Sequence, residues 1–255
     1  MTAALTGAIL ITGASSGIGA ALARLYAHPG TLLFLGGRDE GRLAAVAATC
    51  RDKGADVDAH TVDVTDAEAT ADWIEAADER RPLDLVVANA GISAGTAGGD
   101  EGAAQTRAIF AVNLDGTVNV VEPSIAAMRR RGAGQIALMS SVAGFRGMGG
   151  APAYCASKAA VRVWGEGLRA WLGPQGIKVS VICPGFVATP MTAVNRFPMP
   201  FLMDPDRAAR IIADGLARDR GRIAFPWPTY ALARVLSSLP EPVCDWLGRV
   251  LPGKD

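Results

Sequence analysis

The feature that most constrains the fold is a regular alternation of short apolar runs with longer amphipathic runs along most of the chain. The apolar runs have the length and composition of β-strands, whereas the amphipathic runs have the periodicity of helices. Because helices connect successive strands, we expect right-handed crossovers and one parallel sheet covered on both faces. Strands are expected at 8–12, 31–36, 56–62, 83–88, 135–139, 177–182 and 222–225, and helices at 17–27, 39–53, 66–80, 101–131 (in one or two pieces), 153–172 and 204–219.

Length and composition favour one domain. The chain has 255 residues, half of them apolar, and no linker or repeat divides it, so residues 1–255 are expected to form a single domain. The 25 basic and 25 acidic residues cancel, which argues against nucleic acid as a partner. Four cysteines without a C-x-x-C pair and only two histidines predict no metal site. We see no signal peptide and no spanning apolar run, so we expect a cytoplasmic protein without an integral membrane segment.

Small and polar residues follow four of the expected strands. A glycine-rich turn at 12–19 follows the first strand, and Asn89-Ala90-Gly91 follows the fourth. Ser140-Ser141 follows the fifth strand, and Pro184-Gly185 follows the sixth. Because parallel strands end at a common edge, where α/β sheets bind ligands, these segments are expected to meet in one binding site.

The glycine-rich turn predicts a nucleotide site. Gly13, Gly17 and Gly19 lack a Cβ, which permits a tight turn, close approach of a pyrophosphate and close packing of the following helix. The N–H groups at the start of that helix would then face the phosphates. We therefore predict a Rossmann-type, doubly wound α/β fold with about seven parallel strands and helices on both faces. The G-x3-G-x-G spacing differs from the common fingerprint, so glycines that serve only the turn are the alternative.

The same turn also fits G-x-S-x-G, the nucleophile elbow of α/β-hydrolases, with Ser15 as the nucleophile. That chemistry needs an acid and then a histidine downstream of the serine. The only histidines, His28 and His60, both precede the third expected helix. We therefore set the hydrolase interpretation aside.

Tyr154 and Lys158 form a candidate acid/base pair. Residues four apart share one face of a helix, so the phenol and the ammonium are expected to be neighbours. A tyrosine titrates near ~10 in water, and a nearby cation is expected to lower that pKa. Such a pair is usually an ordinary surface contact, but its place after the serine-bearing fifth strand favours proton transfer.

Together these motifs resemble the short-chain dehydrogenase/reductase family, over roughly residues 5–190. The resemblance implies a single dinucleotide-binding domain with a seven-stranded parallel sheet. It also implies hydride transfer between a nicotinamide and a secondary alcohol/carbonyl pair. The matching pieces are Thr12–Gly19, Asp63-Val64, Asn89-Ala90-Gly91, Asn113, Ser140-Ser141, Tyr154, Lys158, Pro184-Gly185 and Thr189.

The resemblance also implies catalytic roles. Tyr154 is the expected general acid/base, and Lys158 would lower its pKa and bind the nicotinamide ribose. Ser141, 13 positions before Tyr154, would bond the substrate oxygen, and we prefer it to Ser140. Asn113 would anchor a water next to Lys158. The alternative is a catalytically idle NADP(H)-binding sensor or scaffold, which would not need this complete set.

Cofactor contacts are implied on all of these segments. Arg38 follows Gly37, which stands where NAD-binding relatives carry an acid, and its guanidinium can pair with a 2′-phosphate. We therefore predict NADP(H) as the preferred cofactor, with NAD(H) as the alternative because Asp39 and Glu40 also fit the count for a ribose-binding acid. An acid near a helix N-cap is the other interpretation of Asp63. The implied cofactor-binding residues are Gly13, Ser15, Ser16, Gly17, Ile18, Gly19, Arg38, Asp63, Val64, Asn89, Ala90, Gly91, Tyr154, Lys158, Pro184, Gly185, Val187 and Thr189.

The C-terminal third is expected to contain a substrate-covering segment and an extension. Residues 187–204 are rich in apolar side chains, which predicts an apolar substrate, with packing as a loop core as the alternative. Residues 226–255 carry apolar residues at helical spacing, which most often form a packed face; a dimer contact is the second interpretation and peripheral membrane contact the least favoured. Trp164, Leu168 and Trp171 line one face of the Tyr154 helix, and the resemblance implies a homodimer.

Overall fold

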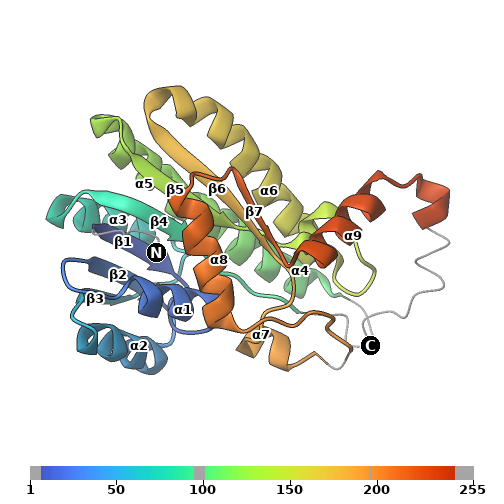
Figure 1. Cartoon of the computed structure of the whole chain (residues 1–255), viewed down its shortest axis with the longest axis horizontal. Helices are drawn as coiled ribbons and strands as arrows, with labels where there is room; N and C mark the ends of the chain where they lie inside the picture. The colour runs from blue at the N-terminus through green and yellow to red at the C-terminus, as the bar shows by residue number, and fades with distance from the viewer. Residues whose placement is uncertain (1–6, 95–100, 196, 245–255) are drawn as a thin grey trace.

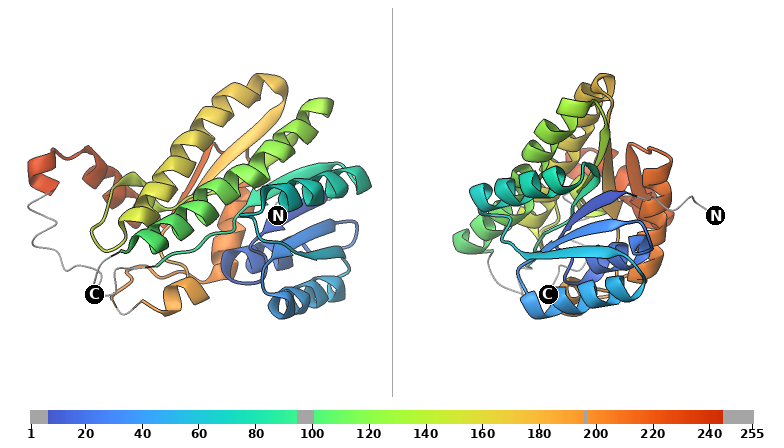
Figure 2. Two further views of the ribbon diagram at one scale, coloured as in Figure 1. Left: turned by 180° about the vertical axis from the view of Figure 1, so that it is seen from behind. Right: turned by 90° about the vertical axis from the view of Figure 1, so that its left-hand side faces the viewer.

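The computed structural model describes residues 7–94, 101–195 and 197–244. They form one seven-stranded parallel sheet in the order β3-β2-β1-β4-β5-β6-β7, with helices on both faces (Figures 1 and 2). The Rossmann-type fold is therefore confirmed. The strands are β1 (Ala8–Thr12), β2 (Leu32–Gly37), β3 (Asp56–Thr61), β4 (Leu83–Ala88), β5 (Gly134–Met139), β6 (Ile177–Pro184) and β7 (Arg222–Phe225).

The helices lie close to their expected positions. Those of the two layers are α1 (Gly17–Tyr26), α2 (Glu40–Asp52), α3 (Ala67–Arg80), α4 (Ala103–Phe110), α5 (Gly116–Arg131), α6 (Pro152–Leu172) and α8 (Pro205–Ala217). The sequence analysis did not foresee the π-helical turn η1 (Ala111–Asp115), the 3-10 turns η2 (Val142–Phe145) and η3 (Gly173–Gln175), or the short helix α7 (Pro190–Ala193). The helical spacing in the C-terminal extension corresponds to α9 (Trp227–Ser238).

The core consists of two apolar layers, one on each face of the sheet. Along β1, Ile9 and Ile11 belong to the layer under α1, α2 and α8, whereas Ala8 and Leu10 belong to the layer under α3, α5 and α6. This alternation follows from the two-residue period of a strand. All five residues of β1 are buried, because this inner strand is covered on both faces of the sheet.

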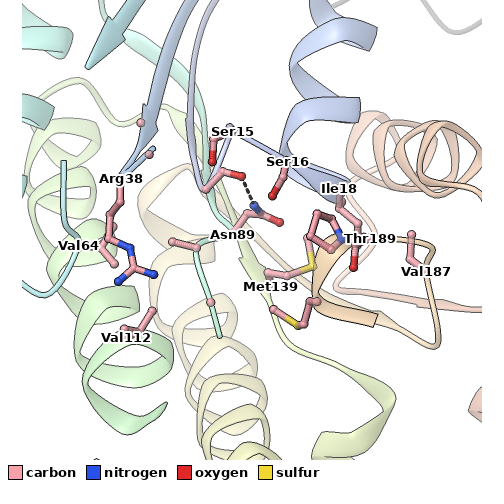
Figure 3. Close-up of a pocket in the computed structure, with 18 of the residues that line it drawn as sticks. Ser15, Ser16, Ile18, Arg38, Val64, Asn89, Val112, Met139, Val187 and Thr189 are labelled. Atoms are coloured by element: carbon pink, nitrogen blue, oxygen red, sulfur yellow. Dashed lines mark hydrogen bonds between the residues drawn. The ribbon is translucent and has the colours of Figure 1, made fainter. Parts of the chain in front are cut away.

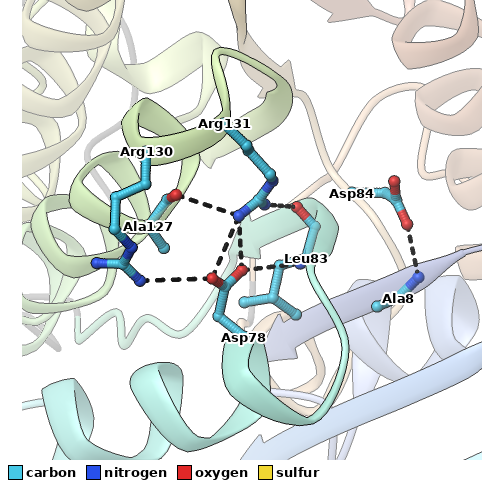
Figure 4. A network of polar contacts seen from close by, with 7 residues as sticks. All are labelled: Ala8, Asp78, Leu83, Asp84, Ala127, Arg130 and Arg131. Atoms are coloured by element: carbon cyan, nitrogen blue, oxygen red, sulfur yellow. Dashed lines mark hydrogen bonds and ion pairs between the residues drawn. The ribbon is translucent and has the colours of Figure 1, made fainter.

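A buried carboxylate joins the second layer to the sheet (Figure 4). Asp78 of α3 is 9% exposed and accepts hydrogen bonds from the Leu83 backbone N–H and from Arg131 Nη1, both at 2.9 Å. Arg130 Nη2 lies 3.5 Å from the same carboxylate. The arginines at the C-terminus of α5 therefore tie α5 to α3 and to the start of β4.

Helix α9 does not bury the apolar face expected of the extension. None of its residues is buried, and Leu232 and Val235 are 59% and 57% exposed. The helix packs mainly against η2 and against β7, the edge strand of the sheet (Figure 1). The interpretation as a packed face is thus wrong for these two residues, while Trp246, Leu247 and Val250 lie outside the described residues.

None of the helices in the described ranges has the length and apolarity required to cross a membrane.

Candidate active site

A cavity of about 770 Å³ lies beyond the carboxyl edge of the sheet (Figure 3). This volume is within the range of about 300–1,000 Å³ that is usual for sites of small molecules and cofactors. The cavity brings together most of the site residues expected from the sequence, and only Gly19 and Asn113 are not in its lining. The expected residues that line it are Gly13, Ser15, Ser16, Gly17, Ile18, Arg38, Asp63, Val64, Asn89, Ala90, Gly91, Ser141, Tyr154, Lys158, Pro184, Gly185, Val187 and Thr189.

The glycine-rich turn follows β1 and makes the floor of one end of the cavity. Gly13 and Gly17 have φ angles of 64° and 54°, in the left-handed region that favours glycine. A Cβ added at Gly17 would lie 2.9 Å from Thr189 Cγ2, so a side chain there would fill the space between the turn and α7. Gly19 faces the other way, because a Cβ there would lie 2.3 Å from Gly13 O. It permits the packing of α1 on the turn rather than lining the cavity.

Side chains at the ends of β1 and β4 hold this turn in place. Asn89 Nδ2 donates to Thr12 O at 2.9 Å and to Gly13 O at 3.3 Å. In return, Thr12 Oγ1 accepts from the backbone N–H groups of Asn89 and Ala90, at 3.0 and 3.1 Å. These four bonds fix the turn to the end of β4.

The turn fits the phosphates of a dinucleotide. Its glycines leave open the space that Cβ atoms would fill, next to the start of α1. Ser16, the N-cap of α1, makes no side-chain cap hydrogen bond within the described part of the chain. The N–H groups of the first turn are thus available to an anion, where the helix dipole also favours negative charge.

The opposite end of this subsite carries Arg38 and Asp63. Arg38 extends toward Val64 and Val112, two apolar residues that could bind the flat face of a base (Figure 3). Its Nη1 atom lies 3.9 Å from Asp63 Oδ2. Asp63 accepts two hydrogen bonds from Thr65, and these, chiefly the one from the backbone, hold its pKa below the usual value. It does not cap α3, because Asp66 occupies that position.

Asp39, the acid that the sequence count offered to a ribose, is already bound to its own helix. It is the N-cap of α2 and accepts from Arg42 N at 2.9 Å and from Arg42 Nε at 2.7 Å. The backbone bond is the main reason why the pKa of Asp39 is lowered. The guanidinium of Arg42 also lines the cavity, so two arginines border this subsite.

Ser141, Tyr154 and Lys158 meet at the other end of the cavity. Ser141 follows β5, accepts a hydrogen bond from Ala143 N at 3.1 Å and donates to Pro184 O at 3.3 Å. Its hydroxyl is also hydrogen-bonded to the phenol of Tyr154. Ser140 has a different partner, because its hydroxyl donates to Lys158 O at 2.7 Å.

Burial governs the protonation of the tyrosine and the lysine. The Lys158 ammonium is 3% exposed, donates to Met139 O at 2.9 Å and lies 5.8 Å from the centre of the Tyr154 ring. Burial lowers the pKa of Lys158 to about 8. Burial likewise raises the pKa of Tyr154, and the hydrogen bond with Ser141 opposes this rise. The expected lowering of the Tyr154 pKa by Lys158 is therefore outweighed in this structure, because desolvation disfavours both charged forms.

Asn113 is completely buried in the π-helical turn η1, outside the cavity lining. Its Oδ1 accepts from Ile92 N at 2.8 Å, and its Nδ2 donates to Ile92 O at 2.9 Å and to Ser157 Oγ at 3.1 Å. These bonds fix α6, one residue before Lys158, to the segment after β4. Single π-turns inside helices often occur at functional sites, and here the turn interrupts what the sequence suggested was a helix at 101–131.

Twelve further residues line the cavity. Asp39, Glu40 and Ser140 were alternatives in the sequence analysis and residues 190–192 belong to the expected substrate-covering segment, whereas the other six were not assigned to the site. Most are neighbours of assigned residues at the strand ends, so the position of the strands was the signal that could have identified them. Val112 carries no local signal, because it reaches the cavity only through the packing of η1. These residues are Gly36, Gly37, Asp39, Glu40, Arg42, Val62, Val112, Met139, Ser140, Pro190, Met191 and Thr192.

The described residues of the segment 187–204 include α7 and are joined to each other near the two ends of the segment. Val187 and Met203 form a parallel bridge, with Ala188 N donating to Met203 O at 2.9 Å. Met203 is buried, whereas Val194 is 75% and Phe201 60% exposed. Packing as a loop core therefore describes Met203 but not the two exposed residues.

Comparisons with known proteins agree with this geometry. The sequence model of the family described as short chain dehydrogenase matches residues 7–198. An uncharacterized oxidoreductase of Myxococcus xanthus is 39% identical over 243 residues, which cover 95% of this chain and 96% of the relative.

Solved structures give the same result. A short-chain dehydrogenase from Sphingobium yanoikuyae in complex with NADPH superposes with a TM-score of 0.79 at 29% identity, covering 92% of this chain and 97% of that one. A short-chain dehydrogenase/reductase from Burkholderia phymatum in complex with NAD has a TM-score of 0.83 at 27% identity, covering 92% and 94%. The chain therefore belongs to the short-chain dehydrogenase/reductase family of oxidoreductases.

Proposed function

We propose that this protein is an NADP(H)-preferring oxidoreductase that interconverts a secondary alcohol and a carbonyl. One observation carries the proposal. Ser141, Tyr154 and Lys158 converge at one end of a cavity whose other end is a glycine-rich turn suited to phosphates. A nicotinamide cofactor lying between these ends would supply or accept the hydride at the substrate carbon.

Tyr154 moves the proton in the proposed reaction. In the reducing direction, its phenol gives a proton to the substrate oxygen as that oxygen gains negative charge, and in the oxidising direction the phenolate takes it back. Ser141 donates a hydrogen bond to the same oxygen. Lys158, with a pKa of about 8, is mainly an ammonium at neutral pH and stabilises the phenolate. Asn113 acts indirectly, because its amide fixes the start of α6 through Ser157.

Two arginines support the preference for NADP(H). Arg38 and Arg42 both border the part of the cavity next to the end of β2. Asp39 is hydrogen-bonded to Arg42 and is thus less able to accept a bond from a ribose 2′-hydroxyl. A guanidinium is well suited to a 2′-phosphate. One structurally similar protein is in complex with NADPH and another with NAD, so these structures favour neither cofactor. The argument for the preference therefore rests on the two arginines.

We also propose an apolar substrate, because Met139, Pro190 and Met191 line the cavity, and the last two belong to the segment 187–204.

A homodimer in the cytoplasm completes the proposal. Of the three residues expected at a subunit contact, Leu168 is buried in the core of this chain and Trp164 packs against that core, whereas Trp171 is 54% exposed. Trp171 and the 57% exposed Val163 are the α6 side chains that a second subunit would cover. None of the four cysteines forms a disulfide, which fits a reducing compartment. Light scattering should give twice the mass of the chain.

The test is oxidation of NADPH by Tyr154→Phe and wild-type protein with a panel of carbonyls of graded apolar size. The variant should bind NADPH as wild type does but lose roughly 10²- to 10⁴-fold in kcat, the usual contribution of a general acid. Unchanged turnover by the variant would exclude Tyr154 as the acid/base. If the wild-type protein binds NADPH but does not oxidise it with any carbonyl of the panel, the protein would instead be a catalytically idle sensor.

A further inference from the structure

The C-terminal helix α9 contacts the body of the protein next to the catalytic serine. It packs on η2 and β7 and extends beyond the end of the sheet (Figure 1). Turn η2 begins directly after Ser141, whose side chain caps it through the 3.1 Å bond from Ala143 N. Any force that holds η2 therefore also acts on the position of the Ser141 hydroxyl.

One side of η2 rests on the helix that carries Tyr154 and Lys158. A Cβ added at Gly144 would lie 2.7 Å from the backbone carbonyl carbon of Lys158, so the turn and α6 are in direct backbone contact. Arg162 of α6 donates from Nε to Gly144 O at 3.2 Å. These contacts between η2 and α6 involve no residue of the C-terminal extension.

The other side of η2 is the ring of Phe145, which the C-terminal extension covers. The Tyr230 ring meets it in a T-shaped arrangement, at a centroid distance of 5.5 Å and an interplanar angle of 71°. Arg234 of α9 lies 6.0 Å from the ring centre, and Arg162 and Arg222 lie 4.7 and 5.4 Å from it. Each cation over an aromatic face contributes modestly, and together they hold the half-buried ring between α6, β7 and α9.

Hydrogen bonds and ion pairs connect this aromatic contact to β7 and α6. Arg222 Nη1 donates to Tyr230 Oη at 3.1 Å, and Arg222 Nη2 pairs with Glu166. Glu166 also accepts from Arg162 Nη1 at 3.2 Å. Further along, Arg146 Nη1 makes a longer bond of 3.4 Å to Leu236 O of α9. Residues from α6, β7 and α9 thus converge on one phenylalanine, four positions after Ser141.

We propose that Phe145 and Tyr230 are positioning residues for Ser141, and that the C-terminal extension serves the reaction by holding η2 against α6. The inference rests on the proposed function, in which Ser141 bonds the substrate oxygen. It gives the extension a task inside each subunit, independent of any dimer or membrane contact. The effect is geometric: a looser η2 lets the serine hydroxyl leave the direction of the Tyr154 phenol, and small misplacements of reacting groups lower rates steeply.

A double-mutant cycle tests whether Phe145 acts through Ser141. Phe145→Leu removes the ring and should lower kcat roughly tenfold, while the KM for NADPH stays unchanged. In a Ser141→Ala background the same change should cost less than about twofold, because no hydroxyl is left to position. Phe145→Tyr keeps the ring and should restore most of the activity.

Two further variants complete the design. Tyr230→Phe removes a single oxygen, should fold as wild type does, and is expected to lower kcat in the same direction by a smaller factor. Leu232→Ala, on the exposed side of α9, is the matched control and should change nothing. Melting temperatures of all variants show whether folding is intact.

The outcomes separate cleanly. An equal loss from Phe145→Leu with and without the Ser141 hydroxyl would overturn the proposal, because the ring would then support the site in general. So would unchanged kcat in both Phe145→Leu and Tyr230→Phe. If the wild-type protein reduces no carbonyl, the proposed function fails. The position of the Ser141 hydroxyl is then tested through the pKa of Tyr154. That pKa is measured by phenolate absorbance, with Tyr154→Phe as the blank that lacks this phenol. Phe145→Leu should raise that pKa as Ser141→Ala does, and no rise would refute the inference.

Discussion

Substitution of Gly19 by alanine tests whether the third glycine of the turn serves packing rather than ligand contact. A Cβ there would lie 2.3 Å from Gly13 O and 2.6 Å from Asn89 Nδ2. Relief to an ordinary contact of 3.4 Å requires a shift of about 1.1 Å by α1 or by the turn. Overpacking of this kind costs ~1–3 kcal/mol, and the reduced backbone freedom of alanine offsets ~0.5–1 kcal/mol. We expect a net loss of about 1–2 kcal/mol in the free energy of unfolding.

The same shift should also weaken nucleotide binding, because Gly13 belongs to the phosphate end of the cavity. We expect a roughly tenfold higher Kd for NADPH, equivalent to ~1.4 kcal/mol. Gly41→Ala is the matched control in the first turn of α2, where a Cβ would meet only Asp39 Oδ1 at 3.8 Å. That variant should be neutral or more stable by up to ~0.5 kcal/mol.

Urea unfolding followed by tryptophan fluorescence at one protein concentration measures the stability, and calorimetry measures the Kd. Two results would refute the reasoning. Gly19→Ala could be as stable as Gly41→Ala, which would mean that the turn yields without cost. It could also lose stability and still bind NADPH like wild type, which would separate the packing of α1 from the phosphate subsite.

Three further predictions concern the network of α3, the buried lysine and the cofactor preference. Asp78→Ala should lower the free energy of unfolding by roughly 3 kcal/mol, because it leaves the buried Leu83 N–H without its acceptor and removes the buried carboxylate that pairs with Arg131, whereas Asp58→Ala at the exposed pair with Arg80 should change it by less than ~1 kcal/mol. Lys158 has a folded-state pKa of about 8, below its usual value, so the native protein binds fewer protons than the unfolded chain between about pH 8 and 10.5. Wild type should therefore gain roughly 1–2 kcal/mol relative to Lys158→Met between pH 7 and 9.5, as measured by urea unfolding. Arg38→Asp should lower the NADPH/NADH ratio of kcat/KM by about tenfold or more, and Arg42→Ala should lower it less.

Each of these has a clear contrary result. Equal losses from the two aspartate variants would show that the buried network is no stronger than a surface pair. A stability difference between wild type and Lys158→Met that is independent of pH would mean that the lysine titrates normally in the folded protein. A cofactor ratio unaffected by Arg38→Asp would show that Arg38 is not the selector.

The order of strands and helices was predictable because it depends on local properties. Apolar runs of strand length and the glycines after the first strand are visible in the sequence, and handedness rules leave few ways to assemble them. The same logic located most of the cavity, since residues that follow parallel strands share an edge. It could not foresee the π-helical turn at Asn113, because the bonds that hold this turn come from Ile92 and Ser157, far away in the chain.

The ionisation of the site illustrates the limit of local reasoning. Spacing along the helix correctly placed Lys158 beside Tyr154, at 5.8 Å from the ring centre. The direction of the Tyr154 pKa was nevertheless wrong, because it depends on how much water reaches the phenol. Desolvation is a property of all surrounding elements and has no signature in a five-residue motif.

The sequence by itself determined the fold class, the carboxyl edge as the location of the cavity and most of the residues gathered there, because strand, turn and helix signals act over a few neighbouring residues. Only the tertiary structure decided which partners those residues choose. It bound Asp39 to Arg42, gave Ser140 and Ser141 different acceptors and placed α9 on η2. These choices depend on contacts between segments distant in the chain, and their geometry is settled only when the whole core has packed.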